Sequence, residues 1–113
     1  MSAVCKALAS SGRNVVLVCA GREDRFTAED GLCAGAMVDR LVSQYGFAAT
    51  DIAEVMRDMY VWAWDNLLQR LSTTRHYNFM LTFDYRDDID FCLQRDIYDI
   101  VPRYDKQAGE VTL

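Results

Sequence analysis

Apolar residues recur at helical spacing through two long stretches of the chain. In the first stretch they are three or four positions apart, which gives one apolar face: Ala34, Met37, Val38, Leu41, Val42 and Tyr45. This spacing predicts a helix that begins just after Thr27 and ends at Gly46. The second stretch predicts a helix from Thr50 to about Ser72, which would be about 33 Å long at 1.5 Å per residue.

A different pattern precedes the first of these helices. Residues 14–19 read NVVLVC, in which Val15 to Val18 are continuously apolar and mostly β-branched. Such a run predicts a strand that is covered on both faces, as in a parallel sheet. Residues 97–103 alternate more weakly, and Pro102 restricts them to an edge strand or a strand end. A last short strand is predicted at 110–113, where it would complete a hairpin.

These elements predict an α/β fold, a partial three-layer sandwich in which long helices cover a small parallel or mixed sheet. The predicted sheet is incomplete. Pairing residues 14–19 with residues 97–103 in parallel would leave free strand edges and an uncovered apolar face. Two completions are open: a second copy of the chain, or a polypeptide that this sequence does not contain. With 113 residues, the chain is expected to form a single domain spanning residues 1–113.

Composition and charge argue against several classes of function. Acidic and basic residues are interspersed and the net charge is −5, whereas proteins that bind nucleic acid present a basic face. The apolar run VVLVCA is far shorter than the roughly 20 residues that span a bilayer. No secretory signal is evident. We therefore expect a cytoplasmic protein that binds neither nucleic acid nor a membrane.

The four cysteines argue against a structural zinc site. None belongs to a Cys-x-x-Cys pair, and the single histidine is His76, whereas zinc needs four convergent ligands. Free, buried thiols in a reducing compartment are the expected state. Cys33 is not expected to be a nucleophile, because it lies in the second helical turn and not in the first, where a thiol pKa would be lowered. With Ala34 and Gly35 it forms a run of small residues that would let this helix pack closely on residues 14–19.

The loop from Gly21 to Thr27 is the first candidate site. It leaves the carboxyl end of the predicted strand and enters a helix N-terminus, which is where open α/β sheets bind ligands. Backbone N–H groups near Thr27, together with Arg22 or Arg25, are suited to an anion such as a phosphate or a sulfonate. Gly21 would let the backbone turn towards that ligand.

Two carboxylates follow this loop, and two interpretations of them stay open. Thr27, Glu29 and Asp30 resemble a capping box, in which they would only stabilise the helix N-terminus. The same carboxylates would also suit a magnesium ion or a substrate, because Mg²⁺ prefers carboxylate and water oxygens. His76, in a predicted helix N-terminal turn, is likewise either a packed histidine or a general acid.

Two long segments of the chain carry a further signal. The first, NVVLVCAGREDRFTAEDGLCAGAMVDRL, combines a valine-rich strand, an Ala-Gly turn, an Arg-Phe-Thr-x-Glu-Asp stretch and a Cys-Ala-Gly helix. The second, RHYNFMLTFDYRDDIDFCLQRDIYDIVPRY, combines a histidine-containing helix, an Asp-x-x-x-Cys helix and a closing Val-Pro strand. In this order the two segments resemble the C-terminal half of the 2-phosphosulfolactate phosphatase family. One departure is Asp84, which stands where the family pattern has glycine.

The resemblance implies an α/β enzyme that uses Mg²⁺ to hydrolyse the phosphate ester of (R)-2-phospho-3-sulfolactate to 3-sulfolactate and phosphate, on a route to coenzyme M or related sulfonates. We assign the candidate residues accordingly. Catalysis is assigned to His76 and Asp30, substrate binding to Gly21, Arg25 and Thr27, and metal binding to Glu29 and Asp30.

Two segments of the family's N-terminal half do not occur here: Asp-x-x-Arg-Ala-Thr and Thr-Thr-x-Asn-Gly-Thr. Independent catalysis is therefore not expected. We expect the chain either to need a complementary N-terminal half or to form a homo-oligomer around its small phosphorylated sulfonate substrate. The alternative, from another class of function, is a truncated and non-catalytic domain that oligomerises or binds an anion.

Overall fold

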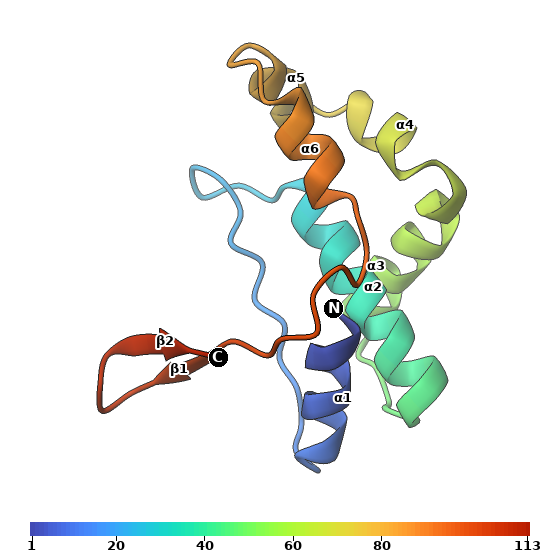
Figure 1. Ribbon diagram of the computed structural model, residues 1–113. Coiled ribbons are helices and arrows are strands. Elements are labelled where there is room, and N and C mark those ends of the chain that lie inside the picture. Colours follow the sequence, from blue (N-terminus) through green and yellow to red (C-terminus); the bar gives the residue numbers. More distant parts are fainter.

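The computed structural model describes all residues 1–113 and consists mainly of helices (Figure 1). The helices are α1 (Ser2–Ser10), α2 (Ala28–Tyr45), α3 (Asp51–Ala63), the 3₁₀ turn η1 (Trp64–Asn66), α4 (Leu67–Ser72), α5 (Arg75–Leu81) and α6 (Arg86–Cys92). The strands β1 (Arg103–Asp105) and β2 (Glu110–Thr112) form one antiparallel sheet. None of the helices combines the length and the apolar character that crossing a membrane requires.

The core lies where α2 and α3 pack against each other. Its buried cluster consists of Leu32, Ala36, Tyr60, Ala63 and Leu71. The two helices approach closely at Gly35, where an added Cβ would lie 2.0 Å from the backbone oxygen of Met56. Gly35 therefore serves the packing of α2 on α3. The prediction that the run from Cys33 to Gly35 packs on residues 14–19 is wrong for Gly35, whereas Ala34 shares an apolar surface with that segment.

The ends of α2 agree with the sequence prediction. Thr27 precedes the helix with an extended backbone, and Gly46 follows it in the left-handed conformation, at a φ of 72°. Glycine adopts that conformation without steric cost, which explains why the helix ends there.

The predicted continuous helix from Thr50 to Ser72 is wrong in its middle. α3 gives way to η1, and Asn66 leaves the helical region with φ and ψ of −143° and 47° before α4 begins. Asp65 and Asn66 have short polar side chains that compete with helical backbone hydrogen bonds, which weakens a helix at this point. The break turns α4 away from the line of α3 (Figure 1).

Residues 14–19 do not form the predicted strand. They run between α1 and α2 as an extended segment (Figure 1), and no backbone hydrogen bond involves residues 14–20. Val16 and Val18 are 84% and 88% exposed, so only one of the two apolar faces is covered. The physical reason is that the chain offers this segment no neighbouring strand.

Near the C-terminus, only the hairpin of the predicted sheet is present. β1 begins after Pro102 and pairs antiparallel with β2, with Tyr104 opposite Val111. Residues 97–102 belong to no strand. The parallel pairing of residues 97–103 with residues 14–19 is thus not supported, and the three-layer arrangement is unconfirmed, while the α/β class holds.

The hairpin turn depends on Asp105. Its carboxylate accepts the backbone N–H groups of Gln107 and Ala108 at 2.7 and 3.1 Å. These bonds favour the ionised form and lower the pKa of Asp105. Gly109 completes the turn at a φ of 70°, so the predicted hairpin is confirmed.

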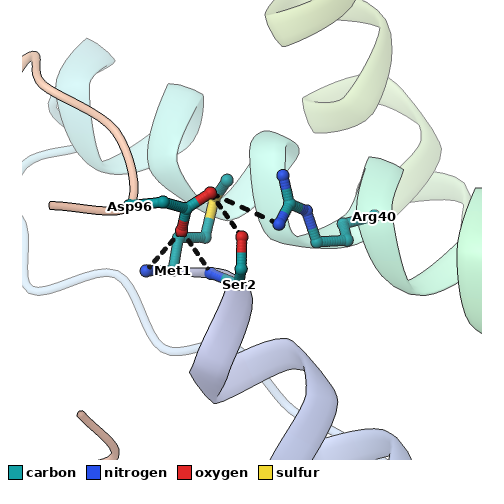
Figure 2. Close-up of polar contacts among 4 residues, drawn as sticks. All are labelled: Met1, Ser2, Arg40 and Asp96. Atoms are coloured by element: carbon teal, nitrogen blue, oxygen red, sulfur yellow. Dashed lines mark hydrogen bonds and ion pairs between the residues drawn. The ribbon is translucent and has the colours of Figure 1, made fainter. Parts of the chain in front are cut away.

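A carboxylate on the segment after α6 ties three parts of the chain together (Figure 2). Asp96 accepts the Ser2 backbone N–H at 2.6 Å and the Ser2 hydroxyl, and it pairs with the Met1 amine at 3.2 Å and with Arg40 of α2 at 3.4 Å. The hydrogen bonds from Ser2 lower the pKa of Asp96 far below its usual range. The clamp fixes the start of α1 against α2.

All four cysteines are free, as predicted, but only Cys5 is buried. Cys19, Cys33 and Cys92 are exposed, which corrects the expectation that the thiols lie inside the core.

Candidate functional site

The loop before α2 is folded into a tight turn. Arg22 and Arg25 exchange two backbone hydrogen bonds of 2.9 and 3.0 Å, and Glu23 and Asp24 between them have φ values of 52° and 57°. Two left-handed residues in succession define a type I′ turn, which usually recruits glycine or asparagine. Holding non-glycine residues in this conformation costs free energy, and such strain is concentrated at functional sites.

Gly21 and Asp30, two of the predicted site residues, are in direct contact. The Gly21 N–H donates to Asp30 Oδ2 at 2.6 Å. Gly21 has a φ of 66°, and an added Cβ would lie 2.6 Å from the backbone oxygen of Arg25. Only glycine fits there. Asp30 therefore holds the base of the loop against the first turn of α2.

His76 and Glu29 also come together, although they are far apart in sequence. The imidazole Nδ1 of His76, on α5, contacts Glu29 Oε1 in the first turn of α2. The two side chains are 29% and 35% exposed. With Glu29 ionised, Nδ1 carries a proton and donates a hydrogen bond to the carboxylate. Nε2 has no protein partner, so it is free to meet a ligand.

An aromatic residue that sequence reasoning missed positions one of the loop arginines. The guanidinium of Arg22 lies 3.6 Å from the ring centroid of Phe79, a cation–π contact. The Phe79 ring is itself stacked on His76, with centroids 6.4 Å apart. The i, i+3 spacing of His76 and Phe79 puts both side chains on one helix face. This spacing is the sequence feature that could have identified Phe79 as part of the site.

This contact separates the two candidate arginines. Arg22 lies over the Phe79 ring of α5 and also pairs with Glu23 at 3.4 Å. Arg25 is exposed, and its side chain makes no polar contact within the chain. The structure therefore links Arg22, through Phe79, to the helix that carries His76, and it leaves the predicted substrate residue Arg25 at the edge of the loop.

Thr27 is in the N-cap position of α2, but its side chain does not cap the helix. The residue is only 8% exposed, and its hydroxyl has no hydrogen-bond partner. The capping interpretation of this side chain is thus wrong. A buried hydroxyl without a partner costs about 1–3 kcal/mol. It is a group that a ligand or a further polypeptide would satisfy.

Glu29 and Asp30 are the residues to which the sequence assigns metal binding. Each has one oxygen engaged, with His76 and Gly21 respectively, and a second oxygen that makes no hydrogen bond. No three side chains of the types His, Cys, Asp or Glu converge as a metal cluster. Mg²⁺ is usually bound by one or two carboxylates together with waters and substrate phosphates, so this donor set fits such an ion.

Glu29 and His76 also line a cavity of about 470 Å³ between α2 and the α4–α6 region. Most of its wall is apolar, and Cys33 contributes to it. Although part of Cys33 is accessible, desolvation by its neighbours, followed by the charge of Asp30, raises the pKa of its thiol. A raised pKa disfavours the thiolate, in agreement with the prediction that Cys33 is not a nucleophile.

Comparisons with known proteins give one consistent answer. The family model described as 2-phosphosulpholactate phosphatase matches residues 1–107. A probable 2-phosphosulfolactate phosphatase of Caldanaerobacter subterraneus is 34% identical over 103 residues, which are 91% of this chain and 43% of that protein. Another, of Clostridium beijerinckii, is 31% identical over 110 residues, or 96% of this chain and 45% of that protein.

A third relative with the same description, from Pseudothermotoga lettingae, is 34% identical over 84% of this chain and 43% of its own length. The chain thus spans less than half the length of the curated relatives it matches. No solved structure matches it.

Proposed function

Since the chain belongs to the 2-phosphosulfolactate phosphatase family, we propose that it forms one wall of an active site that hydrolyses the phosphate ester of (R)-2-phospho-3-sulfolactate. The observation that carries this proposal is the contact of His76 with Glu29. It joins the two segments that carry the family resemblance, and it leaves Nε2 available. The chain spans less than half of its relatives, so the proposed activity requires the remaining part of the enzyme.

His76 is the proposed general acid. In the hydrolysis, water attacks the phosphorus atom, the bond between phosphorus and the C2 oxygen breaks, and that oxygen takes up a proton. In its imidazolium form, His76 would donate this proton from Nε2, while Glu29 holds the ring through Nδ1. Asp30, assigned to catalysis from the sequence, acts in this proposal by holding the loop through Gly21.

The anionic groups of the substrate would bind at the loop. Arg22, held by Phe79, offers a planar set of donors suited to a phosphate or a sulfonate. The N-terminus of α2, with the unpartnered Thr27 hydroxyl, adds backbone donors and a favourable dipole. Arg25 could join them from the opposite side of the turn.

Mg²⁺ is the proposed cofactor, with Glu29 and Asp30 as its ligands from this chain through the oxygens that have no other partner. When bound, the ion would stabilise negative charge on the phosphoryl oxygens. The remaining ligands would come from water, the substrate and the rest of the enzyme.

A second candidate function is a non-catalytic domain that oligomerises or binds an anion. The feature that favours it is exposed apolar surface: Trp62 on α3 is 75% exposed, and residues 14–20 have no backbone partner. A cytoplasmic location stays a prediction, supported by the four free thiols.

The proposal is tested by phosphate release from (R)-2-phospho-3-sulfolactate with Mg²⁺. The assay compares the chain alone, the unmatched part of the Caldanaerobacter relative alone, and the two together. We expect release only from the mixture. His76→Gln should lower kcat by about 10²–10⁴-fold, the usual contribution of a general acid. Arg75→Gln, on the same helix and without a polar contact, is the control and should leave kcat unchanged.

A complex that forms and shows no release would contradict the catalytic proposal and favour the second candidate.

A further inference from the structure

Residues 14–20 carry a set of unpaired backbone groups next to an apolar surface. No backbone hydrogen bond of the chain involves any of these seven residues. Successive residues of an extended chain direct their N–H and C=O groups to opposite edges. Both edges of the segment are therefore open, which is unusual for a valine-rich run.

The two faces of the segment differ. Val15 and Leu17 are half-buried and share an apolar surface with Val38 and Leu41 of α2. On the other face, Val16 and Val18 are 84% and 88% exposed. The segment is thus attached to α2 on one side and lacks cover on three: two edges and the outer face.

A second copy of the chain would not satisfy all three. In a two-fold dimer, the segment of one copy would pair with the same segment of the other along a single edge. The second edge of each copy would stay open, and an open edge invites further, unlimited pairing. A polypeptide that brings a strand to each edge and an apolar layer to the outer face would cover the whole segment.

The relatives contain enough chain for this purpose. The Caldanaerobacter protein matches 91% of this chain, yet the match takes up only 43% of its own length. More than half of that protein therefore has no counterpart here. This unmatched part is long enough to provide strands and a covering layer of helices.

We propose that residues 14–20 are the docking strand for this complementary polypeptide, which adds one β-strand to each edge and buries Val16 and Val18. The segment then becomes an inner strand of a sheet layered between helices, as its apolar sequence predicts. The inference rests on the missing part that the proposed function invokes, and not on the catalytic roles of any residue.

Hydrogen–deuterium exchange tests the proposal without substrate. The chain is measured alone and with the unmatched part of the Caldanaerobacter relative as the probe. We expect the amides of residues 14–20 to exchange at least about 100-fold more slowly in the mixture. Binding that protects other segments but leaves residues 14–20 unprotected would overturn the proposal, and so would the absence of binding. Slow exchange in the chain alone, together with a dimer by light scattering, would assign the segment to a second copy instead.

Proline variants test each edge separately. Val16→Pro removes an N–H at one edge and Cys19→Pro removes one at the other, while Val16→Thr and Cys19→Ser keep the donor. Because these N–H groups are unpaired in the chain, its circular dichroism should not change. Each proline should weaken binding of the probe by about 10-fold or more, and the controls should weaken it far less.

Equal affinity of the proline variants and their controls would overturn the docking strand. If the two polypeptides bind through residues 14–20 but the mixture shows no phosphatase activity, the result would count against the proposed function alone.

Discussion

The α2–α3 pair and residues 14–20 are both rich in apolar side chains, yet only the first completes its interactions within the chain. A helix satisfies its backbone hydrogen bonds internally, so α2 and α3 need only each other to bury Leu32, Ala36 and Tyr60. A strand satisfies its backbone only with neighbours, and residues 14–20 have none.

An apolar pattern therefore reports where a segment lies in a complete fold. Only 11 of the 113 residues are buried, which is few for a chain of this length. The helices form that small core among themselves, whereas the valine-rich segment lacks a covering layer within the chain.

Truncating one apolar side chain in each region should give the largest difference. Leu41 in α2 is 4% exposed, so Leu41→Ala should lower the free energy of unfolding by about 3 kcal/mol. Val18 is 88% exposed, and Val18→Ala should change it by less than about 0.5 kcal/mol. Urea unfolding followed by circular dichroism measures both. A similar loss of unfolding free energy in the two variants would contradict the difference between the two regions.

The close approach of α2 and α3 predicts a second difference. Gly35→Ala places a methyl group against a backbone oxygen that cannot move independently. Despite the gain of about 1 kcal/mol in helix propensity, it should destabilise the chain by about 2 kcal/mol. At Gly31 the nearest atoms are the side-chain ends of Phe26 and Met59, which can shift. Gly31→Ala should therefore cost clearly less in the same urea experiment, and an equal cost would contradict this account of the packing.

The Asp96 clamp predicts a stability that depends on pH. Its pKa is lowered in the folded state, chiefly by the hydrogen bonds from Ser2. The clamp should be fully stabilising above the unfolded value of about 4, and its contribution should fall as the pH drops below that value.

Since the Asp96 side chain is 34% exposed, solvent screening limits the effect of Asp96→Asn to about 1 kcal/mol at pH 7. Urea unfolding at pH 7 and at pH 3 compares the variant with the parent chain. We expect the difference to shrink at the lower pH. A constant difference at both pH values would show that the carboxylate charge does not stabilise the clamp.

The turn between α5 and α6 predicts the smallest effect. Asp84 has a φ of 60°, where a side chain costs free energy and glycine does not. Asp84→Gly should stabilise the chain by about 0.5 kcal/mol, and Asp84→Ala should destabilise it by a similar amount relative to the parent. Thermal unfolding of the three chains checks the order, and a more stable alanine variant would contradict it.

The sequence predicted those features that depend on local interactions. Gly46 ends α2 because of its own backbone freedom, and the hairpin at β1 and β2 forms between segments that are close in the chain. The break after Ala63 was missed because the apolar spacing of α3 continues across η1, whereas backbone competition at Asn66 decides the outcome.

For the candidate site, residue types could be predicted and their partners could not. His76, Glu29, Asp30 and Gly21 were chosen singly, and the structure pairs them as His76 with Glu29 and Asp30 with Gly21. The choice between Arg22 and Arg25 depended on Phe79, which comes from a helix more than fifty residues away. Contacts at such separation are set by the packing of α5 near α2 and leave no local trace in the sequence.

The most direct test of the central claim is amide hydrogen exchange of the chain alone, resolved by residue with NMR. We expect protected amides along α2 and α3, and exchange of residues 14–20 at nearly the rates of an unstructured peptide. Protection of residues 14–20 in a monomeric chain would contradict it, because the segment would then have found its hydrogen-bond partners without any other polypeptide.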